Sequence, residues 1–458
     1  MTDDSDDQSP EWDDWRVLDR RSLLAASGVG VGIALGGCLG DDEDDDDDEE
    51  PEDDDPGEEE EDDPTDPDDD DDDDDEEEDE EEDLPDPTDT ETALIEPETL
   101  HEWQEAGLVN KEDVDGTHRV VILRVDDWYV DADQEAEIQS FDEGHIPGAV
   151  PIEAGDIHAM RLEGLAEAAP LVATGDQMDD VMEKAGVCPE TTIVVSGSSP
   201  LRTARVYWTL RYWGFPRERV KILNGGYHAY GEAYDLEEGE FDPAVTADAD
   251  FSVEANEELN NDLRLGIAQM IQRVDNLNEG ESDDVILENR THPQPDIMIS
   301  NAIWDDATAT HGHDHYRGMY DDTAEWYDAD EIEDYYDDLG VGPDDTVITY
   351  CGSGYRATKS FFALDGILGW DDVMVYDGSY SRQWVQYAGD DVPDEWRVDM
   401  HDRTDGDEEW HDIEIAVDEI PELESPEANQ VEAADIEYMG GDADEEDDEN
   451  GANGDWGC

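Results

Sequence analysis

The sequence predicts an α/β protein with two similar domains, each built on a mainly parallel β-sheet with helices on both faces. A length of 458 residues is ordinary for two or three domains. Residues 192–204 and 346–358 share one pattern: a short apolar run, a loop of small residues that ends in arginine, and a helical segment. Similar apolar runs alternate with helical segments across residues 94–400, and this alternation is typical of a parallel sheet.

Each half contains apolar runs that predict strands, with helical segments between them. Residues 178–184 and 329–339 are two of the predicted helices. We therefore expect domains over residues 94–248 and 254–400, followed by an acidic tail, residues 401–458, that packs partly on the body and then frays. The predicted strands are residues 120–123, 192–195, 220–223, 285–287, 346–350 and 373–376.

The composition excludes several classes of protein. The chain has 139 acidic and 23 basic residues, a formal charge of −116, so no basic stripe exists that could bind nucleic acid. Four cysteines are too few for a disulfide scaffold of this length. No apolar run reaches about 18 residues, so a membrane-spanning helix is not expected. Hydrophobic residues make up 36%, with 13 Trp and 17 Tyr, which is enough for packed cores.

The negative charge is spread through the predicted domains as well as through one long block. In residues 41–83, 37 of the 43 positions are acidic and almost nothing is apolar, so we expect residues 38–93 to be a disordered, extended linker. Nineteen of the 23 basic residues are arginine. This acidic, lysine-poor composition resembles that of proteins from extreme halophiles. An ordinary acidic protein with a long acidic segment is the alternative.

The N-terminus has the features of an export signal. A pair of arginines, Arg20 and Arg21, precedes a weakly apolar stretch, residues 23–35, that is too short to span a membrane. The sequence Leu-Gly-Gly-Cys that ends at Cys38 resembles a lipobox, which implies cleavage after residues 1–37 and a lipid on the Cys38 thiol. The predicted location is the extracellular face of the cell membrane, with a lipid anchor. Residues 1–19 are acidic, unlike a usual signal, and a buried hairpin or short helix is the alternative.

One loop has the residues for nucleophilic chemistry. Cys351 follows a predicted strand directly, and Gly352 and Gly354 allow the backbone to curl before a helix begins after Arg356. Successive N–H groups in such a curl converge on one point and bind an anion, and the helix N-terminus adds positive potential. Both effects favour the thiolate form of cysteine, which is the nucleophile. A buried, inert cysteine is the alternative.

Four motifs, taken in order and spacing, resemble the tandem-domain rhodanese family of thiosulfate and 3-mercaptopyruvate sulfurtransferases. They are Gly-His-Ile-Pro-Gly-Ala at residues 144–149, Leu-Asn-Gly-Gly-Tyr at 223–227, the Cys351 loop at 351–356, and Tyr-Asp-Gly-Ser-Tyr-Ser at 376–381. The resemblance covers roughly residues 94–400. It implies two tandem rhodanese-like domains and no cofactor.

The resemblance also implies a covalent mechanism in two steps. The Cys351 thiolate takes the outer sulfur of a donor such as thiosulfate, and a thiol or cyanide acceptor then removes it from the persulfide. The first part of the loop, Cys-Gly-Ser-Gly, is similar to the mercaptopyruvate branch, whereas its final arginine is similar to the thiosulfate branch, so the donor stays open. The implied persulfide-binding residues are Gly352, Ser353, Gly354, Tyr355 and Arg356.

The first half lacks this chemistry. When Arg202 is aligned with Arg356, Gly197 occupies the place of Cys351, and no thiol is near. The resemblance implies that the first domain is non-catalytic and packs against the second to shape the cleft. Cys188 precedes a predicted strand, so we expect it to be structural.

Weaker features concern donor and metal binding. Arg290, in Glu-Asn-Arg after a predicted strand, is a candidate for the donor's anionic end, with a surface ion pair as the alternative. His311, His313 and His315 alternate and could chelate zinc or copper, but a solvated loop is favoured because no second cluster completes a site. No metal site is predicted, and no role is assigned to Cys458.

Two other functions share the predicted fold. A non-enzymatic module could use the anion-binding loop to carry or sense sulfur species, or to dock a partner, because a fold alone does not assign chemistry. A phosphatase of related fold is the second alternative. Its loop usually has seven residues, so the six residues at 351–356 favour sulfur.

Overall fold

The computed structural model of the chain describes residues 84–110, 118–126, 140–243, 246, 251–256, 258–290, 297–305, 325–406, 410–411 and 413–440. All of them belong to one compact unit, Glu80–Cys458. The predicted signal and most of the predicted linker lie outside the described residues. No helix among the described residues is long and apolar enough to cross a membrane.

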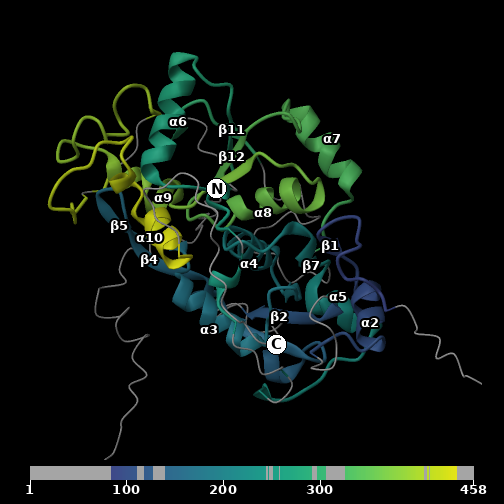
Figure 1. Cartoon of the computed structure of the whole chain (residues 1–458). Helices are drawn as coiled ribbons and strands as arrows, with labels where there is room; N and C mark the ends of the chain where they lie inside the picture. The colour runs from purple at the N-terminus through teal and green to yellow at the C-terminus, as the bar shows by residue number, and fades with distance from the viewer. Residues whose placement is uncertain are drawn as a thin grey trace, which may run out of the picture. The chain divides into compact units, whose positions relative to one another are not determined.

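The first domain is built on a five-stranded parallel sheet (Figure 1). Its strands, in spatial order, are β1 (Leu94–Ile95), β7 (Val220–Leu223), β6 (Thr192–Gly197), β2 (Val120–Asp126) and β3 (Ala149–Glu153). The three strands predicted in this half are confirmed. The parallel pairing follows from the helices that connect successive strands.

Side chains alternate across this sheet and bury both of its faces. Val121 and Leu123 face α3 (Gly175–Ala185) and α4 (Pro200–Tyr212) in one core. Val120 and Ile122 face α2 (Pro97–Glu105) and α5 (Gly226–Ala233) in another. Continuous apolar runs are what a strand buried on both faces requires, so helices cover both faces as predicted.

The second domain repeats this plan. Its parallel sheet has the order β11 (Ile303–Trp304), β9 (Val285–Glu288), β12 (Val347–Tyr350), β13 (Val373–Tyr376) and β8 (Arg264–Leu265). One face packs on α6 (Ile267–Glu279) and α9 (Ser379–Arg382). The other packs on α7 (Ala329–Leu339), α8 (Ala357–Phe361) and its π-helical continuation η9 (Phe362–Ile367). Helices α4 and α8 contact each other, so one apolar core runs from the first sheet to the second.

An antiparallel hairpin, β4 (His158–Glu163) with β5 (Ala166–Val172), extends from the first domain onto the second. Its turn is held by Tyr387, whose hydroxyl donates to the carbonyl of Glu163 (2.8 Å) and accepts the N–H of Leu165 (2.9 Å). A side chain at Gly164 (φ +66°) would meet Ile267, Trp396 and Tyr387 within 3 Å. The sequence reasoning above did not predict this hairpin.

The C-terminal segment packs on the body along the residues that the structure describes. Helix α10 (Gln430–Tyr438) lies against β4 (Figure 1), where Asp435 accepts two hydrogen bonds from Arg161 (2.6 and 2.8 Å) and one from Tyr212 (2.8 Å). Burial raises the pKa of the Asp435 carboxyl, although Arg161 opposes that shift. The acidic tail therefore packs on the body through residue 440.

The remaining elements are short. Strand β10 (Met298–Ile299) pairs with β14 (Thr404–Asp405), which lies beyond residue 400. At the other end, Ala93, which was expected in the linker, is buried, and its N–H donates to the carbonyl of Gly366 (2.8 Å). The ordered body thus extends past both expected limits. The 3-10 helices are η3 (Phe141–Glu143), η4 (Ala154–Ile157), η5 (Arg217–Arg219), η7 (Val253–Ala255), η8 (Asn261–Leu263), η10 (Trp384–Tyr387) and η11 (Pro426–Ala428).

Candidate active site

Cys351 is the first residue after strand β12, and its thiol is free and buried. The N–H of Ser353 points at its Sγ across 3.5 Å. The backbone N–H of Cys351 donates to Ser379 Oγ (3.2 Å), and its carbonyl accepts the N–H of Tyr380 (2.8 Å). The Cys351 backbone is therefore held by hydrogen bonds at both its N–H and its carbonyl.

The loop after Cys351 curls as the two glycines predict. Gly354 has φ +82°, and a Cβ there would lie 2.7 Å from the carbonyl oxygen of Asp377, so only glycine fits. Gly352 and Ser353 are half-buried at the mouth of the loop. Arg356 is also half-buried and directly precedes α8, so the helix begins after Arg356 as predicted; its side chain makes no capping hydrogen bond. Among these loop residues, Ser353 is the one whose backbone N–H is directed at the Cys351 sulfur.

The turn after strand β13 supports this loop. Ser379 has φ +54°, a left-handed conformation that is uncommon for a residue with a side chain. This backbone brings its hydroxyl to the N–H of Cys351, while the hydroxyl proton is donated to the carbonyl of Tyr376 (3.0 Å). The N–H of Ser381 donates to the carbonyl of Gly352 (3.0 Å). Residues 379–381 therefore hold the first two residues of the loop.

Asp377, at the start of the same turn, is fully buried between the two domains. It accepts hydrogen bonds from Arg205 Nη1 (2.9 Å), Arg264 Nε (3.1 Å) and the N–H of Val172 (2.7 Å). Burial alone would raise the pKa of this carboxyl, but Arg205 and Arg264 outweigh burial and lower it. Arg264 also pairs with the buried Glu163 of the hairpin. The Asp377 carboxylate thus binds groups of both domains next to the loop.

Tyr355 connects the loop to the first domain. Its hydroxyl lies 2.8 Å from Nδ1 of His158. Two guanidinium groups of the first domain lie over its ring: Cζ of Arg202 is 4.5 Å and Cζ of Arg205 is 5.4 Å from the ring centroid. Burial raises the pKa of the Tyr355 phenol. Arg202 is the residue that the internal repeat aligns with Arg356, so this position of the first domain contacts the Cys351 loop of the second.

Arg290 lies beside this site. Its guanidinium makes a bidentate pair with Glu288 (both bonds 2.8 Å), donates to the carbonyl of Ile297 (2.8 Å) and covers the ring of Tyr380 at 4.2 Å. An ion pair is therefore present, but it is largely buried, unlike the surface ion pair of the alternative interpretation. Donor binding by Arg290 stays a prediction.

Several predicted features cannot be placed. Cys38, Cys458 and the histidines His311, His313 and His315 lie outside the described residues. Within the described part of the chain, no group of three or more His, Cys, Asp or Glu side chains is arranged to hold a metal ion. Cys188 is buried and disulfide-bonded, and Arg119 Nη1 donates to its sulfur (3.2 Å), which agrees with the expected structural role.

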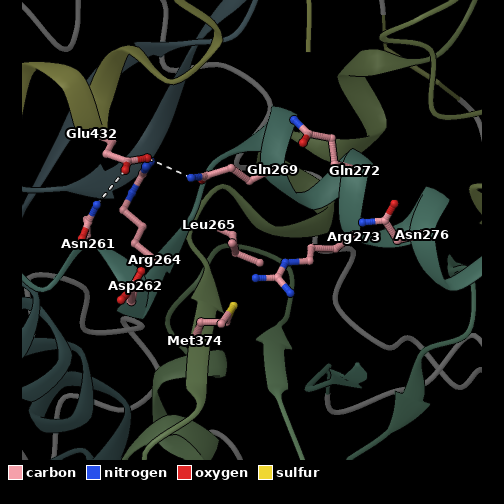
Figure 2. A pocket seen from close by; sticks show the side chains of 10 residues that line it. All are labelled: Asn261, Asp262, Arg264, Leu265, Gln269, Gln272, Arg273, Asn276, Met374 and Glu432. Atoms are coloured by element: carbon pink, nitrogen blue, oxygen red, sulfur yellow. Dashed lines mark hydrogen bonds between the residues drawn. The ribbon is translucent and has the colours of Figure 1, made fainter. Parts of the chain in front are cut away.

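A polar cavity of about 250 Å³ lies elsewhere, between η8, β8, α6 and α10 (Figure 2). No residue of the Cys351 loop lines it. Its Glu432 accepts hydrogen bonds from Asn261 and Gln269 (both 2.8 Å), and Arg273 pairs with Asp284 (3.0 Å). These polar groups bind one another, and none of the residues predicted for catalysis or substrate binding lines this cavity.

Three residues of the site carry no role in the sequence interpretation: His158, Arg205 and Asp377. Asp377 lies within a motif that the resemblance identified, but its partner Arg205 is 172 residues away. Arg205 follows the repeated arginine position by three residues, which puts both on one face of a helix. That spacing is a signal that could have indicated Arg205.

The fold and this loop define a known class. The family model for the rhodanese-like domain matches residues 116–233 and 275–386, about half of the chain. The chain therefore belongs to the rhodanese-like family and carries two copies of the domain, with the free cysteine in the second.

Individual relatives are distant. A protein of Haloferax volcanii, provisionally named a thiosulfate sulfurtransferase, is 26% identical over 63% of this chain and 93% of its own length. The sulfur carrier protein TtuD of Thermus thermophilus is 22% identical over 59% of this chain and 90% of its own. The crystal structure of the 3-mercaptopyruvate sulfotransferase SseA from Escherichia coli has a TM-score of 0.46 and 23% identity, covering 64% of this chain and 100% of that one.

Proposed function

We propose that the protein is a sulfurtransferase that moves sulfane sulfur from thiosulfate or 3-mercaptopyruvate to a thiol or cyanide through a persulfide on Cys351. The observation that carries the proposal is the free thiol at the head of a curled loop, with the Ser353 N–H directed at its sulfur. The names of distant relatives support the same reaction class.

The proposed reaction needs no cofactor. The Cys351 thiolate attacks the outer sulfur of thiosulfate, a new S–S bond forms, and the old S–S bond breaks as sulfite leaves with the electron pair. The terminal sulfur of the persulfide is then attacked by the acceptor, which restores the thiolate. Each intermediate carries negative charge at the loop, where the Ser353 N–H and the start of the α8–η9 helix favour it.

A sulfur carrier is the second candidate, and the similarity to a protein named as a sulfur carrier favours it. A carrier would use the same persulfide but pass it to a protein partner. Turnover with small-molecule acceptors separates the two functions.

We also propose that the chain is exported by the twin-arginine route and anchored by lipid at Cys38. The arginine pair, the short apolar stretch and the lipobox-like sequence support this. Labelling of whole cells with a radioactive fatty acid tests it: we expect label on the wild-type chain, and none on Cys38→Ser. Label retained on Cys38→Ser would refute the anchor.

The reaction is tested with the full chain in multimolar salt, because its charge density requires screening. Thiosulfate:cyanide and mercaptopyruvate:cyanide transfer are measured for wild type and Cys351→Ser, and mass spectrometry follows addition of one sulfur atom. We expect turnover and a persulfide in the wild type only. A folded wild type that accepts sulfur but does not turn over would favour the carrier. Activity retained by Cys351→Ser would refute the mechanism.

A further inference from the structure

We propose that Arg205, a residue of the non-catalytic first domain, is a positioning residue for the Cys351 nucleophile and acts through Asp377. The inference rests on the proposed function, since it assigns a role within the same site. It concerns a side chain that reaches the loop from the other domain, whose own aligned loop has Gly197 in the place of Cys351.

The first step is the contact between Arg205 and Asp377. Both side chains are fully buried, and Nη1 of Arg205 donates to Oδ1 of Asp377 at 2.9 Å. A buried charged hydrogen bond of this kind is short and directional. Removing Arg205 would leave Oδ1 of Asp377 without this partner, while Oδ2 keeps its bonds to Arg264 and the N–H of Val172. Arg205 also lies 4.5 Å from the ring of Trp208, so its guanidinium is held in one place by its own helix.

The second step is the contact between Asp377 and the loop. The carbonyl oxygen of Asp377 occupies the space that a side chain on Gly354 would need, and Nη1 of Arg205 lies 3.0 Å from that same point. Two residues later Ser379 accepts the Cys351 N–H, and Tyr380 donates to the Cys351 carbonyl. A shift of Asp377 therefore moves both groups that fix the nucleophile.

The third step separates this pair from ordinary interface packing. Helix α4 also carries Arg211, whose Nε lies 3.2 Å from the buried Asp365 of the second domain. Tyr207 and Arg217 bond to the same carboxylate. This network crosses the same interface, but no hydrogen bond described here joins Asp365 to residues 351–356. Arg211 is thus a matched control on the same helix.

The consequence for the reaction is a loss of alignment rather than of binding. Arg205 has no exposed surface, so it does not touch a donor in solution. Misplacement of a reacting group by about 1 Å costs on the order of 100-fold in rate. We therefore expect an Arg205 variant to lower kcat and the reactivity of the Cys351 thiol, and to change KM much less.

The test compares Arg205→Lys with Arg211→Lys in the full chain at multimolar salt. Lysine keeps the positive charge but cannot reproduce the planar guanidinium contact, and it is the variant better able to fold. For each variant we would measure kcat and KM with thiosulfate, the pH profile of Cys351 alkylation by iodoacetamide, and the free energy of unfolding in urea. Asp377→Asn serves as the second variant on the other side of the contact.

We expect Arg205→Lys and Asp377→Asn to lower kcat and the alkylation rate by roughly 10- to 100-fold and to change the alkylation pH profile. Arg211→Lys should lose about as much unfolding free energy as Arg205→Lys, but its kcat, alkylation rate and alkylation pH profile should stay those of the wild type. Equal loss of rate in both arginine variants would overturn the inference, since the effect would then follow stability alone. A wild type without turnover, but with alkylation selectively changed by Arg205→Lys, would refute the proposed function and leave the positioning role intact.

Discussion

The hydroxyl of Tyr355 lies 2.8 Å from Nδ1 of His158, and this contact joins the catalytic loop to the hairpin of the other domain. Tyr355 is the fifth residue of the loop, and its ring also lies under Arg202. Three side chains from two domains therefore meet at the end of the loop opposite to Cys351.

Tyr355→Phe should lower the free energy of unfolding by about 1 kcal/mol, because it removes one buried hydrogen bond and keeps the ring under Arg202. His158→Ala should cost a similar amount, and the double variant should show a coupling energy of about 0.5–1 kcal/mol in urea unfolding. Tyr327→Phe, at an exposed tyrosine, should change stability by less than about 0.5 kcal/mol. Additive losses in the double variant would mean that the two side chains do not interact.

Ser379 combines an unfavourable backbone conformation with a functional hydroxyl, and two substitutions separate these effects. Ser379→Ala keeps φ near +54° and leaves the N–H of Cys351 without its acceptor, whereas Ser379→Gly loses the hydroxyl but relieves the backbone strain. We expect both variants to transfer sulfur more slowly, and the alanine variant to be about 1 kcal/mol less stable than the glycine variant. Equal stability of the two in chemical denaturation would contradict the assigned strain.

The two glycines of the loop should respond differently to alanine. Gly354→Ala places a methyl group 2.7 Å from the carbonyl oxygen of Asp377 in a left-handed backbone, so we expect a loss of about 1–3 kcal/mol and of most activity. Gly352→Ala meets only the Ser381 hydroxyl, at 3.3 Å, and should cost less. Thermal unfolding and thiosulfate turnover measure the difference. A milder effect at position 354 than at 352 would refute the description of the loop.

Lys221, on strand β7, should make the free energy of unfolding depend on pH in the alkaline range. Burial lowers the pKa of its ammonium from 10.5 to about 8, against the opposing charges of Glu218 and Asp86. Between about pH 8 and 10.5 the unfolded chain binds more protons at this group than the folded chain, so the unfolding free energy contributed by Lys221 rises with pH in that window.

Lys221→Met removes the buried charge and should stabilise the protein at pH 7 by about 2–3 kcal/mol, less the hydrogen bond from Nζ to Thr90 Oγ1. The gain should shrink as the pH approaches 10, because the wild-type lysine then folds uncharged. Urea unfolding of both chains from pH 7 to 10 checks this. A gain that grows with pH would show that the sign is wrong.

The strands and helices of the two sheets could be predicted because their signals are local. Residues 329–339 read as a helix from their own periodicity, and α7 has these bounds. The run at residues 285–287 predicts β9, and its apolar side chains are those that a sheet covered on both faces needs. Neighbouring residues carry all of this information.

The hairpin and the ion pairs of Asp377 could not be predicted, because their partners lie far along the chain. Strand β5 (Ala166–Val172) contains three alanines and a proline and has little intrinsic strand preference. Its place is set by contacts with the second domain, such as the bond from Val172 to Asp377 across 205 residues. No alternation in residues 158–172 indicates where those partners are.

The hairpin also determines whether the two repeats can exist apart. A first half ending before residue 254 would leave Glu163 without Arg264 and the N–H of Leu165 without Tyr387. The second half alone would lose the charge that faces Arg264 and the turn that fills the space between Ile267 and Trp396. During synthesis on the ribosome, the β4–β5 hairpin of the first domain can contact its partners only after the second domain has been made. We therefore expect either half alone to be much less stable than the whole chain, since each would expose buried groups whose partners lie in the other half.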